Sequence, residues 1–220
     1  MTRIKVDLHV HTSLSYDAFN PFKMALKIAE LRGIGCIAIT EHNDMIIDYK
    51  DLLNKPLRII LGEEIMTSEG EIIGLFLLNR IEPGLSPEKT IEEIRKQGGL
   101  VYLPHPFSGT KKRRGNFPIN TLHRIAKCID IVEVMNSRGI DMKASIEFAQ
   151  RYELLMGAGS DAHTPFEIGN AYVEMEPFLG KEDFLDKLKR GKIRGKFTPK
   201  WYRILSNRFV RKGLRSLVSF

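Results

Sequence analysis

The sequence predicts a single α/β domain built on a parallel sheet or barrel. Apolar runs of strand length alternate with helix-like stretches about seven times along the 220 residues, which is the pattern of strand–helix–strand units. A hydrophobic content of 43% is enough for one substantial core. Acidic residues and histidines cluster directly after several strand-like runs, and the carboxyl ends of barrel strands are where such folds carry their chemistry.

The expected strands are short runs in which β-branched and aliphatic residues dominate. Four of these runs stop at a cluster of acidic residues and histidines, namely 4–6, 36–39, 100–103 and 154–158. Three further runs have the same character, namely 57–61, 72–78 and 129–134. The chain is therefore expected to deliver polar side chains from several strands to one end of the sheet.

The expected helices begin at residues that favour helix starts. Asn20-Pro21 and Ser86-Pro87 each place proline in a first helical turn, and Gly33 is a typical stop for the first of these helices. Further helices are expected at 120–127, 140–151 and 181–189. The sequence contains no internal repeat and no long linker, so residues 1–220 are expected to form one domain.

Hydropathy and cysteine content narrow the class of protein. The sequence contains no apolar run of about 18 residues, which predicts no transmembrane segment and a cytoplasmic protein. The two cysteines, Cys36 and Cys128, fit neither a disulfide framework nor a zinc-finger spacing. We therefore expect free thiols and no disulfide-linked partner.

Charge is distributed unevenly along the chain. Residues 187–220 contain 12 Lys or Arg and no Asp or Glu, so the net charge of +7 leaves −5 (7 minus 12) for residues 1–186. This basic C-terminal segment, 187–220, is expected to pack an apolar helix face on the barrel and to expose its cations. Binding of nucleic acid or of an anionic membrane surface is the alternative.

Five of the six histidines lie in short clusters with acidic residues or at the end of an expected strand. Imidazole and carboxylate ligands together suit Zn, Mn and Fe, whereas an all-oxygen set would indicate Mg or Ca. Four such clusters at strand ends predict a site for more than one metal ion. The clusters are Asp7-Leu8-His9-Val10-His11, Glu41-His42, His105-Pro106 and Asp161-Ala162-His163.

Spacing within the clusters supports chelation. Alternate residues of a strand share a face, so His9 and His11 can bind one ion from the same side. Asp161 and His163 repeat that spacing. The sixth histidine, His123, lies in an expected helix and is not assigned to the site.

Taken in order, these clusters resemble the successive motifs of the PHP superfamily, named for polymerase and histidinol phosphatase. The resemblance runs from residue 7 to residue 163, and it implies a distorted (β/α)7 TIM-like barrel with two or three metal ions at the C-terminal ends of the strands. It also implies hydrolysis of phosphate esters. The motifs that carry it are Asp7-Leu8-His9-Val10-His11-Thr12, Thr40-Glu41-His42, Gly62-Glu63-Glu64, His105-Pro106 and Ser160-Asp161-Ala162-His163.

The same resemblance implies three groups of metal ligands, with one glutamate shared between the first two. The first group is His9, His11, Glu64 and Asp161. The second is Glu64 with His105. The third is Asp17, His42 and His163.

Two positions depart from the pattern of many relatives. Glu71 stands where they have a histidine in the strand after the bridging glutamate; a carboxylate can still be a ligand there, and it favours harder ions such as Mn over Zn. Glu41 stands where they have Asp, and we expect it to orient a neighbour or to be a surface carboxylate rather than to bind metal. The expected cofactors are therefore two or three divalent ions, Mn, Zn or Fe.

The expected catalytic residues follow from this ligand set. Two ions about 3.5 to 4 Å apart can share a hydroxide and hold phosphoryl oxygens for in-line attack, so no protein nucleophile is needed. Asp161 is expected to accept the proton of the attacking water. His42 or His163 would assist the leaving alkoxide if the third site were empty or exchangeable.

A basic loop is one candidate for substrate binding. Lys111-Lys112-Arg113-Arg114 follows the His105 cluster and is flanked by glycines. Such a run suits a phosphate-gripping flap, in which Arg113 and Arg114 would bind substrate, or an exposed solvated loop.

The strand end after Glu133 is the second candidate. Arg138 is a candidate phosphate ligand and Asn136 a candidate contact to metal or substrate. Glu133 and Asn136 are three positions apart, so a regular strand would not direct both side chains into the barrel mouth. Glu133 is therefore expected to be a buried group behind the ligands.

These features favour a metal-dependent phosphoesterase, a phosphatase acting on a small phosphomonoester or a nucleotide. A histidinol-phosphate phosphatase is one alternative, although nothing in these residues selects histidinol. A nuclease that binds RNA or DNA through its basic tail is another, and a non-catalytic, metal-stabilised binding module is an alternative of a different class. Metal-dependent amidohydrolases also begin with His-x-His after a first strand, but they use a bridging carboxylated lysine where this chain offers Glu64.

Overall fold

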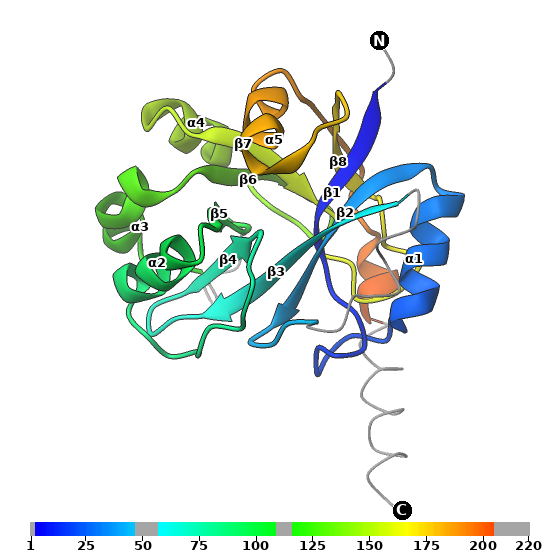
Figure 1. Ribbon diagram of the computed structural model, residues 1–220, viewed down its shortest axis with the longest axis horizontal. Helices are drawn as coiled ribbons and strands as arrows, with labels where there is room; N and C mark the ends of the chain where they lie inside the picture. Colours follow the sequence, from blue (N-terminus) through cyan, green and yellow to red (C-terminus); the bar gives the residue numbers. More distant parts are fainter. Residues whose placement is uncertain (1–2, 47–56, 109–115, 205–220) are drawn as a thin grey trace, which may run out of the picture.

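The computed structural model describes residues 3–46, 57–108 and 116–204. Its strands form a single nine-stranded sheet in the order β7-β6-β5-β4-β3-β2-β1-β8-β9, and helices lie around the outside of that sheet (Figure 1). The strands are β1 Ile4–Val10, β2 Ile34–His42, β3 Arg58–Met66, β4 Glu71–Leu75, β5 Leu100–Leu103, β6 Ile131–Asn136, β7 Leu155–Gly159, β8 Ala171–Met175 and β9 Lys192–Gly195. The helices are α1 Phe22–Leu31, α2 Pro87–Lys96, α3 Ile119–Ile125, the 3-10 helix η2 Ala126–Cys128, α4 Met142–Arg151 and α5 Gly180–Leu188.

The sheet curls until its β7 side meets β1, which confirms the prediction of a distorted barrel. The backbone N–H of His11 donates to the carbonyl of Ala162 (3.0 Å), and that of Asp161 donates to the carbonyl of His9 (2.8 Å). A parallel bridge joins Val10 to Ala162. The segment after β7 therefore runs beside the end of β1, and it brings the motif at Asp161 next to the motif at His9.

Alternation of strand and helix was expected, but among the described residues no helix separates β3 from β4 or β7 from β8. A tight turn in which Thr67 N–H bonds the Gly70 carbonyl (2.8 Å) leads directly from β3 to β4, so β4 is antiparallel to β3 and to β5. Strand β8 is antiparallel to β1, and β9 is antiparallel to β8. Strands β8 and β9 were not predicted. Strand β9 is polar and exposed, so its sequence looks like part of the basic tail.

Helix starts and stops follow the local sequence. Ser86 caps α2 by accepting a hydrogen bond from Lys89 N–H, and Pro87 occupies the first turn. Asp141 caps α4 in the same way by accepting from Ala144 N–H. Helix α1 ends before Gly33, whose φ of 66° lies in the left-handed region that glycine tolerates.

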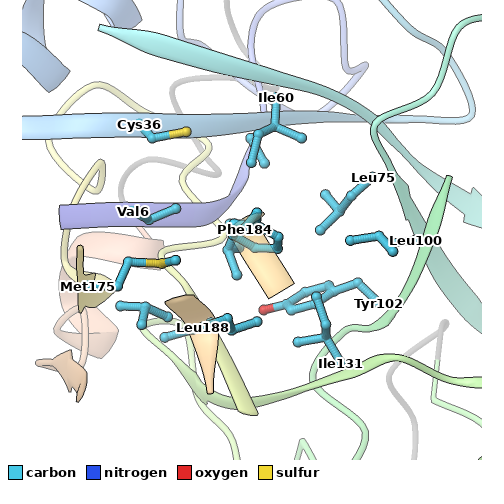
Figure 2. Packing of buried hydrophobic residues seen from close by; sticks show 14 of the residues in the cluster. Val6, Cys36, Ile60, Leu75, Leu100, Tyr102, Ile131, Met175, Phe184 and Leu188 are labelled. Carbon is cyan, nitrogen blue, oxygen red and sulfur yellow. The ribbon is translucent and has the colours of Figure 1, made fainter. Parts of the chain in front are cut away.

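The barrel interior is apolar at the end where the parallel strands begin. Side chains from the first halves of the strands, including Val6, Cys36, Leu100 and Ile131, form one buried cluster. Phe184 and Leu188 of α5 belong to the same cluster, so α5 covers this end of the barrel (Figure 2). The opposite end is left for polar side chains.

The basic C-terminal segment is described only up to residue 204. Thr198 N–H donates to the carbonyl of Ser137 (2.7 Å), and the hydroxyls of Tyr202 and Thr164 are 2.8 Å apart, so this part is fastened to loops at the carboxyl ends of β6 and β7. Residues 205–220, which hold the rest of the predicted basic segment, lie outside the described residues. Within the described ranges, no helix is both long and apolar enough to cross a membrane.

Candidate metal centre

His9 and His11, at the end of β1, face each other across a short gap inside the barrel. Their Nε2 atoms are 3.0 Å apart, and both side chains are fully buried. The other ring nitrogens are held from behind, since His9 Nδ1 lies 3.2 Å from Glu133 Oε1 and His11 Nδ1 lies 3.2 Å from Ser15 Oγ. Two ring nitrogens so close together must share a proton or a cation, and a pair of imidazole ligands suits a divalent cation.

Close packing of β7 against β1 makes this arrangement specific. A Cβ at Gly159 would lie 2.2 Å from His9 Cβ and 2.7 Å from Glu133 Oε1. Glycine is therefore required at the end of β7, because any side chain would displace the histidine and the carboxylate that supports it.

Glu64, in the middle of the cluster, is the carboxylate that most histidines approach. Its Oε1 lies 3.0 Å from His105 Nε2, and its Oε2 lies 3.0 Å from His42 Nδ1. Burial by itself raises the pKa of Glu64, but the positive charges of His9 and His42 hold that pKa well below its usual range. Glu64 thus remains ionised and can contact more than one cation.

Asp161 and His163 come from the loop that follows β7. Asp161 has a left-handed φ of 52°, and its Oδ1 lies 3.6 Å from His11 Nε2 and 3.4 Å from His163 Nδ1. His163 Nδ1 also donates to the backbone carbonyl of Asp161 (3.0 Å). A strained residue kept at this position is consistent with a functional role.

Asp17, His42 and His163 meet at the outer side of the cluster. Asp17 Oδ1 is 3.5 Å from His42 Nε2, and Asp17 Oδ2 is 3.3 Å from His163 Nε2. Burial raises the pKa of Asp17, but the hydrogen bond and charge of His163 outweigh it and lower the pKa to about 2. Burial lowers the pKa of His42, but the Glu64 carboxylate outweighs that effect and raises it to about 9.

Glu71, the residue that replaces a histidine of many relatives, also faces the cluster. It is buried at the start of β4, and its Oε2 lies 3.8 Å from His105 Nε2. The antiparallel β4 therefore presents this carboxylate beside His105.

Four groups of three side chains bring ligand atoms within 4.8 Å of one another. They are His9, His11 and Asp161; His9, Glu64 and His105; His42, Glu64 and Glu71; and His11, His42 and His163. Eight of the nine sequence-predicted ligands fall in these groups, and Asp17 pairs with the last one. The structure thus brings together residues of four strands, β1 to β4, and of the segments that follow β1, β5 and β7.

Of the four expected substrate-binding residues, two lie in the described part of the chain and two do not. Arg138 is largely buried, with its Nε 4.0 Å from Glu167 Oε1. Asn136 is fully buried, and its amide nitrogen donates to Glu133 Oε2 (2.9 Å) and to Asp161 Oδ2 (3.3 Å). Arg113 and Arg114, with the rest of the basic loop, lie outside the described residues.

Glu133 and Asn136 point the same way, which the spacing argument excluded. The pairing of β6 with β7 shifts register between Glu133 and Met135, so a β-bulge replaces regular alternation. As expected, Glu133 is a buried group behind the ligands: it accepts hydrogen bonds from His105 N–H (2.8 Å) and the Tyr102 hydroxyl (3.0 Å).

Glu41 is fully buried, so of its two expected roles the surface carboxylate is wrong and the orientation of a neighbour remains. It accepts hydrogen bonds from the backbone and hydroxyl groups of Thr12 and Ser15. Ser15 was not predicted as part of the site, although a hydroxyl residue four positions after His11 was the available signal. His123 lies away from the cluster and contacts the Tyr152 hydroxyl (2.6 Å).

The sequence of this chain is similar to one protein family and to two archaeal proteins. Residues 139–193 match the family described as PHP-associated (PHP_C). The uncharacterized protein MJ0417 of Methanocaldococcus jannaschii is 36% identical over 197 residues, which cover 84% of this chain and 79% of that protein. The uncharacterized protein MJ1587 of the same organism is 43% identical over 126 residues, covering 51% of this chain and 74% of that protein.

Several solved structures have a similar fold. A two-domain protein of Bacteroides vulgatus, containing a predicted PHP-like metal-dependent phosphoesterase, has a TM-score of 0.65 and 20% identity, covering 89% of this chain and 65% of that one. The lesion-specific endonuclease EndoQ of Pyrococcus furiosus has a TM-score of 0.60 and 16% identity, covering 87% and 58%. This chain therefore spans less than two thirds of both proteins, and at such identities the likeness concerns the fold alone.

Proposed function

Because this chain belongs to the PHP superfamily, we propose that it is a metal-dependent phosphoesterase that hydrolyses a small phosphomonoester or a nucleotide. The observation that carries the proposal is the convergence of buried imidazole and carboxylate ligands at the carboxyl ends of the barrel strands. Such a cluster is costly to bury without bound cations, because its charges are removed from water.

The residues fit two or three ions. One would be held by His9, His11, Glu64 and Asp161, a second by Glu64, Glu71 and His105, and a third by Asp17, His42 and His163. Mixed imidazole and carboxylate ligands suit Mn, Zn or Fe, and the carboxylate of Glu71 favours Mn. When bound, the ions would supply an activated water and a positive field for the phosphoryl oxygens.

The protein's own side chains then have separate tasks. Asp161 accepts the proton of the attacking water. Asn136 orients the Asp161 carboxylate by donating a hydrogen bond to its Oδ2 (3.3 Å). His42 and His163 are the least buried of the clustered histidines, with side chains 13% and 7% exposed, so they would assist the leaving group when the third ion is absent or exchanges. Arg138 is the candidate partner for a phosphate oxygen.

A second candidate substrate, unpaired nucleic acid, is favoured by an aromatic rim consisting of Tyr16, Phe19, Phe166 and Trp201. These side chains are 62% to 70% exposed. Tyr16 lies 5.4 Å from the His42 ring, and Phe19 N–H donates to the carbonyl of His163 (2.8 Å). Exposed aromatic rings beside a phosphate site are what single-stranded nucleic acid needs for base stacking.

The experiment that tests hydrolysis uses metal-stripped protein reloaded separately with Mn, Zn, Fe and Mg. The panel contains phosphomonoesters, phosphodiesters, nucleotides and short RNA and DNA. We expect turnover only with a transition metal, and none in a His9→Ala/His11→Ala variant. His123→Ala is the matched control, because it removes a histidine outside the cluster and should retain full activity.

The preferred substrate separates the two candidates. A nuclease should lose substrate affinity steeply between low and physiological salt, since it releases counterions from several phosphates, whereas a small-ester phosphatase should lose little. Trp201→Ala should weaken only the binding of oligonucleotides, and Leu31→Ala is its control, an equally exposed side chain at the far end of α1. Intact substrates throughout the panel, with ions still bound, would reject catalysis and leave the binding-module alternative.

A further inference from the structure

The buried carboxylate of Glu41 organises the loop that follows β1. Its two oxygens accept hydrogen bonds from Thr12 N–H (3.0 Å) and Ser15 N–H (3.1 Å). The hydroxyl groups of both residues also donate to it, at 2.5 Å each. Glu41 is an acceptor at every one of these contacts, because an ionised carboxylate has no hydrogen to give.

This polarity fixes the direction of the next hydrogen bonds. The Ser15 hydroxyl has a single hydrogen, and Glu41 Oε2 receives it. Ser15 Oγ can therefore only accept from its remaining neighbours, which are His42 N–H (3.0 Å) and His11 Nδ1 (3.2 Å). His11 must then carry its ring hydrogen on Nδ1.

We propose that Ser15, held by Glu41, is a positioning residue that fixes the ring tautomer of His11. The consequence lies at the other ring nitrogen, since Nε2 is left without a hydrogen. That atom is 3.0 Å from His9 Nε2 and 3.6 Å from Asp161 Oδ1, so its lone pair points to the place where the proposed function requires a cation.

A comparison within the cluster shows why a serine needs the glutamate. His9 Nδ1 faces the Glu133 carboxylate, and His163 Nδ1 faces the Asp161 backbone carbonyl, both of which only accept. A hydroxyl can donate or accept, so by itself it would permit either tautomer of His11. Glu41 removes that freedom because it takes the only hydrogen of the Ser15 hydroxyl. This gives a chemical reason for the burial of the Glu41 carboxylate.

The tautomer can be observed directly by NMR of the histidine ring nitrogens in the metal-free protein. We expect His11 in the wild-type protein to have Nδ1 protonated and Nε2 unprotonated, with a His11→Asn variant assigning the signals. Ser15→Ala should remove this preference and lower the affinity for Mn or Zn about 10- to 100-fold. Ser15→Thr, which keeps the hydroxyl, should retain both the tautomer preference and the metal affinity.

Controls separate positioning from loop stability. Ser13 accepts a hydrogen bond from Asn20 N–H (2.9 Å) in the same loop, and within the described part of the chain its side chain makes no hydrogen bond to a histidine, so Ser13→Ala should leave the tautomer and the metal affinity unchanged. The ring of His163 should keep its tautomer in every variant. A protonated Nε2 on His11 in the wild-type spectrum would overturn the proposal even if Ser15→Ala did not fold.

An equal loss of metal affinity in Ser13→Ala and Ser15→Ala would also overturn it. The proposal rests on the proposed function only in taking a divalent cation as the bound species. If no phosphoester were hydrolysed, the tautomer and affinity measurements would still be decided by the same spectra and titrations. Failure of catalysis and failure of this inference are therefore distinguishable.

Discussion

The two ends of the barrel interior are built from opposite kinds of side chain. At the closed end, apolar residues of the strands pack against Phe184 and Leu188 of α5 (Figure 2). At the open end, the same strands present histidines and carboxylates that are just as deeply buried. Burial of apolar surface stabilises the fold, whereas burial of charges costs free energy unless partners compensate. The apolar packing at the closed end therefore stabilises a fold in which the charged cluster at the open end is destabilising by itself.

The largest expected effect is at the open end, from Asp161→Asn. An amide cannot accept the proton of the attacking water, so kcat should fall about 1,000-fold or more, equivalent to about 4 kcal/mol. Metal affinity should fall much less, because the amide oxygen still offers a ligand. Kinetics at saturating Mn and a metal titration measure the two effects separately.

Asp141→Asn is the matched control for that change. Asp141 caps α4, and asparagine caps helices equally well, so activity and stability should stay close to wild type. Near-normal kcat in the Asp161→Asn protein would reject the assigned role.

At the closed end, Phe184→Ala should lower the free energy of unfolding by about 3–5 kcal/mol. The ring is fully buried and packs against Phe178, with a centroid separation of 5.0 Å. Denaturant unfolding measures the loss, while the activity per folded molecule should be unchanged. Leu179→Ala, at a site 81% exposed, should change stability by no more than about 0.5 kcal/mol. A matching loss of metal affinity would show that the two ends are not independent.

The stabilisation by bound metal should be independent of the packing at the closed end. Ions bound only to the folded state stabilise it by about 3 kcal/mol at 100 times their dissociation constant, so chelation should lower the unfolding free energy by a similar amount. Readdition of Mn should restore it, and Phe184→Ala protein should show the same difference. Unfolding of the His9→Ala/His11→Ala variant should be far less sensitive to chelator; identical sensitivity would place the stabilising ion elsewhere.

The smallest expected effect concerns two neighbouring glutamates of β3. Burial raises the pKa of Glu63 to about 7, whereas the histidines lower that of Glu64. The folded state then binds the Glu63 proton more tightly than the unfolded state does, so this group costs stability as pH rises from about 4.5 to 7.

Glu63→Gln should therefore gain stability relative to wild type across that window, by about 1–3 kcal/mol at pH 8 compared with pH 4. Glutamine keeps an oxygen that can accept from Ile81 N–H, the bond that Glu63 Oε2 makes at 2.7 Å. Parallel denaturant curves of the two proteins from pH 4 to 8 measure this. A constant difference would mean that Glu63 titrates normally in the folded protein.

The sequence was a good guide to strands and ligands where the local pattern carries the signal. All seven expected strands exist, but β1 extends to Val10 and β2 to His42, because counting apolar residues ends a strand at its first buried polar side chain. Strand β9 has no apolar pattern and forms by pairing with β8. Its position follows from the sheet around it.

By itself, the sequence determined which imidazoles and carboxylates follow the strands and in what order, and these residue types at strand ends already predict a centre for divalent cations. Only the tertiary structure decided how they are supported. The β6 bulge turns Glu133 and Asn136 to the same side. The fold also places the buried Glu41 carboxylate where it accepts the hydrogen bond of the Ser15 hydroxyl. These contacts join residues that are far apart in the chain or out of strand register. No local pattern encodes them, because their geometry depends on how the whole barrel closes.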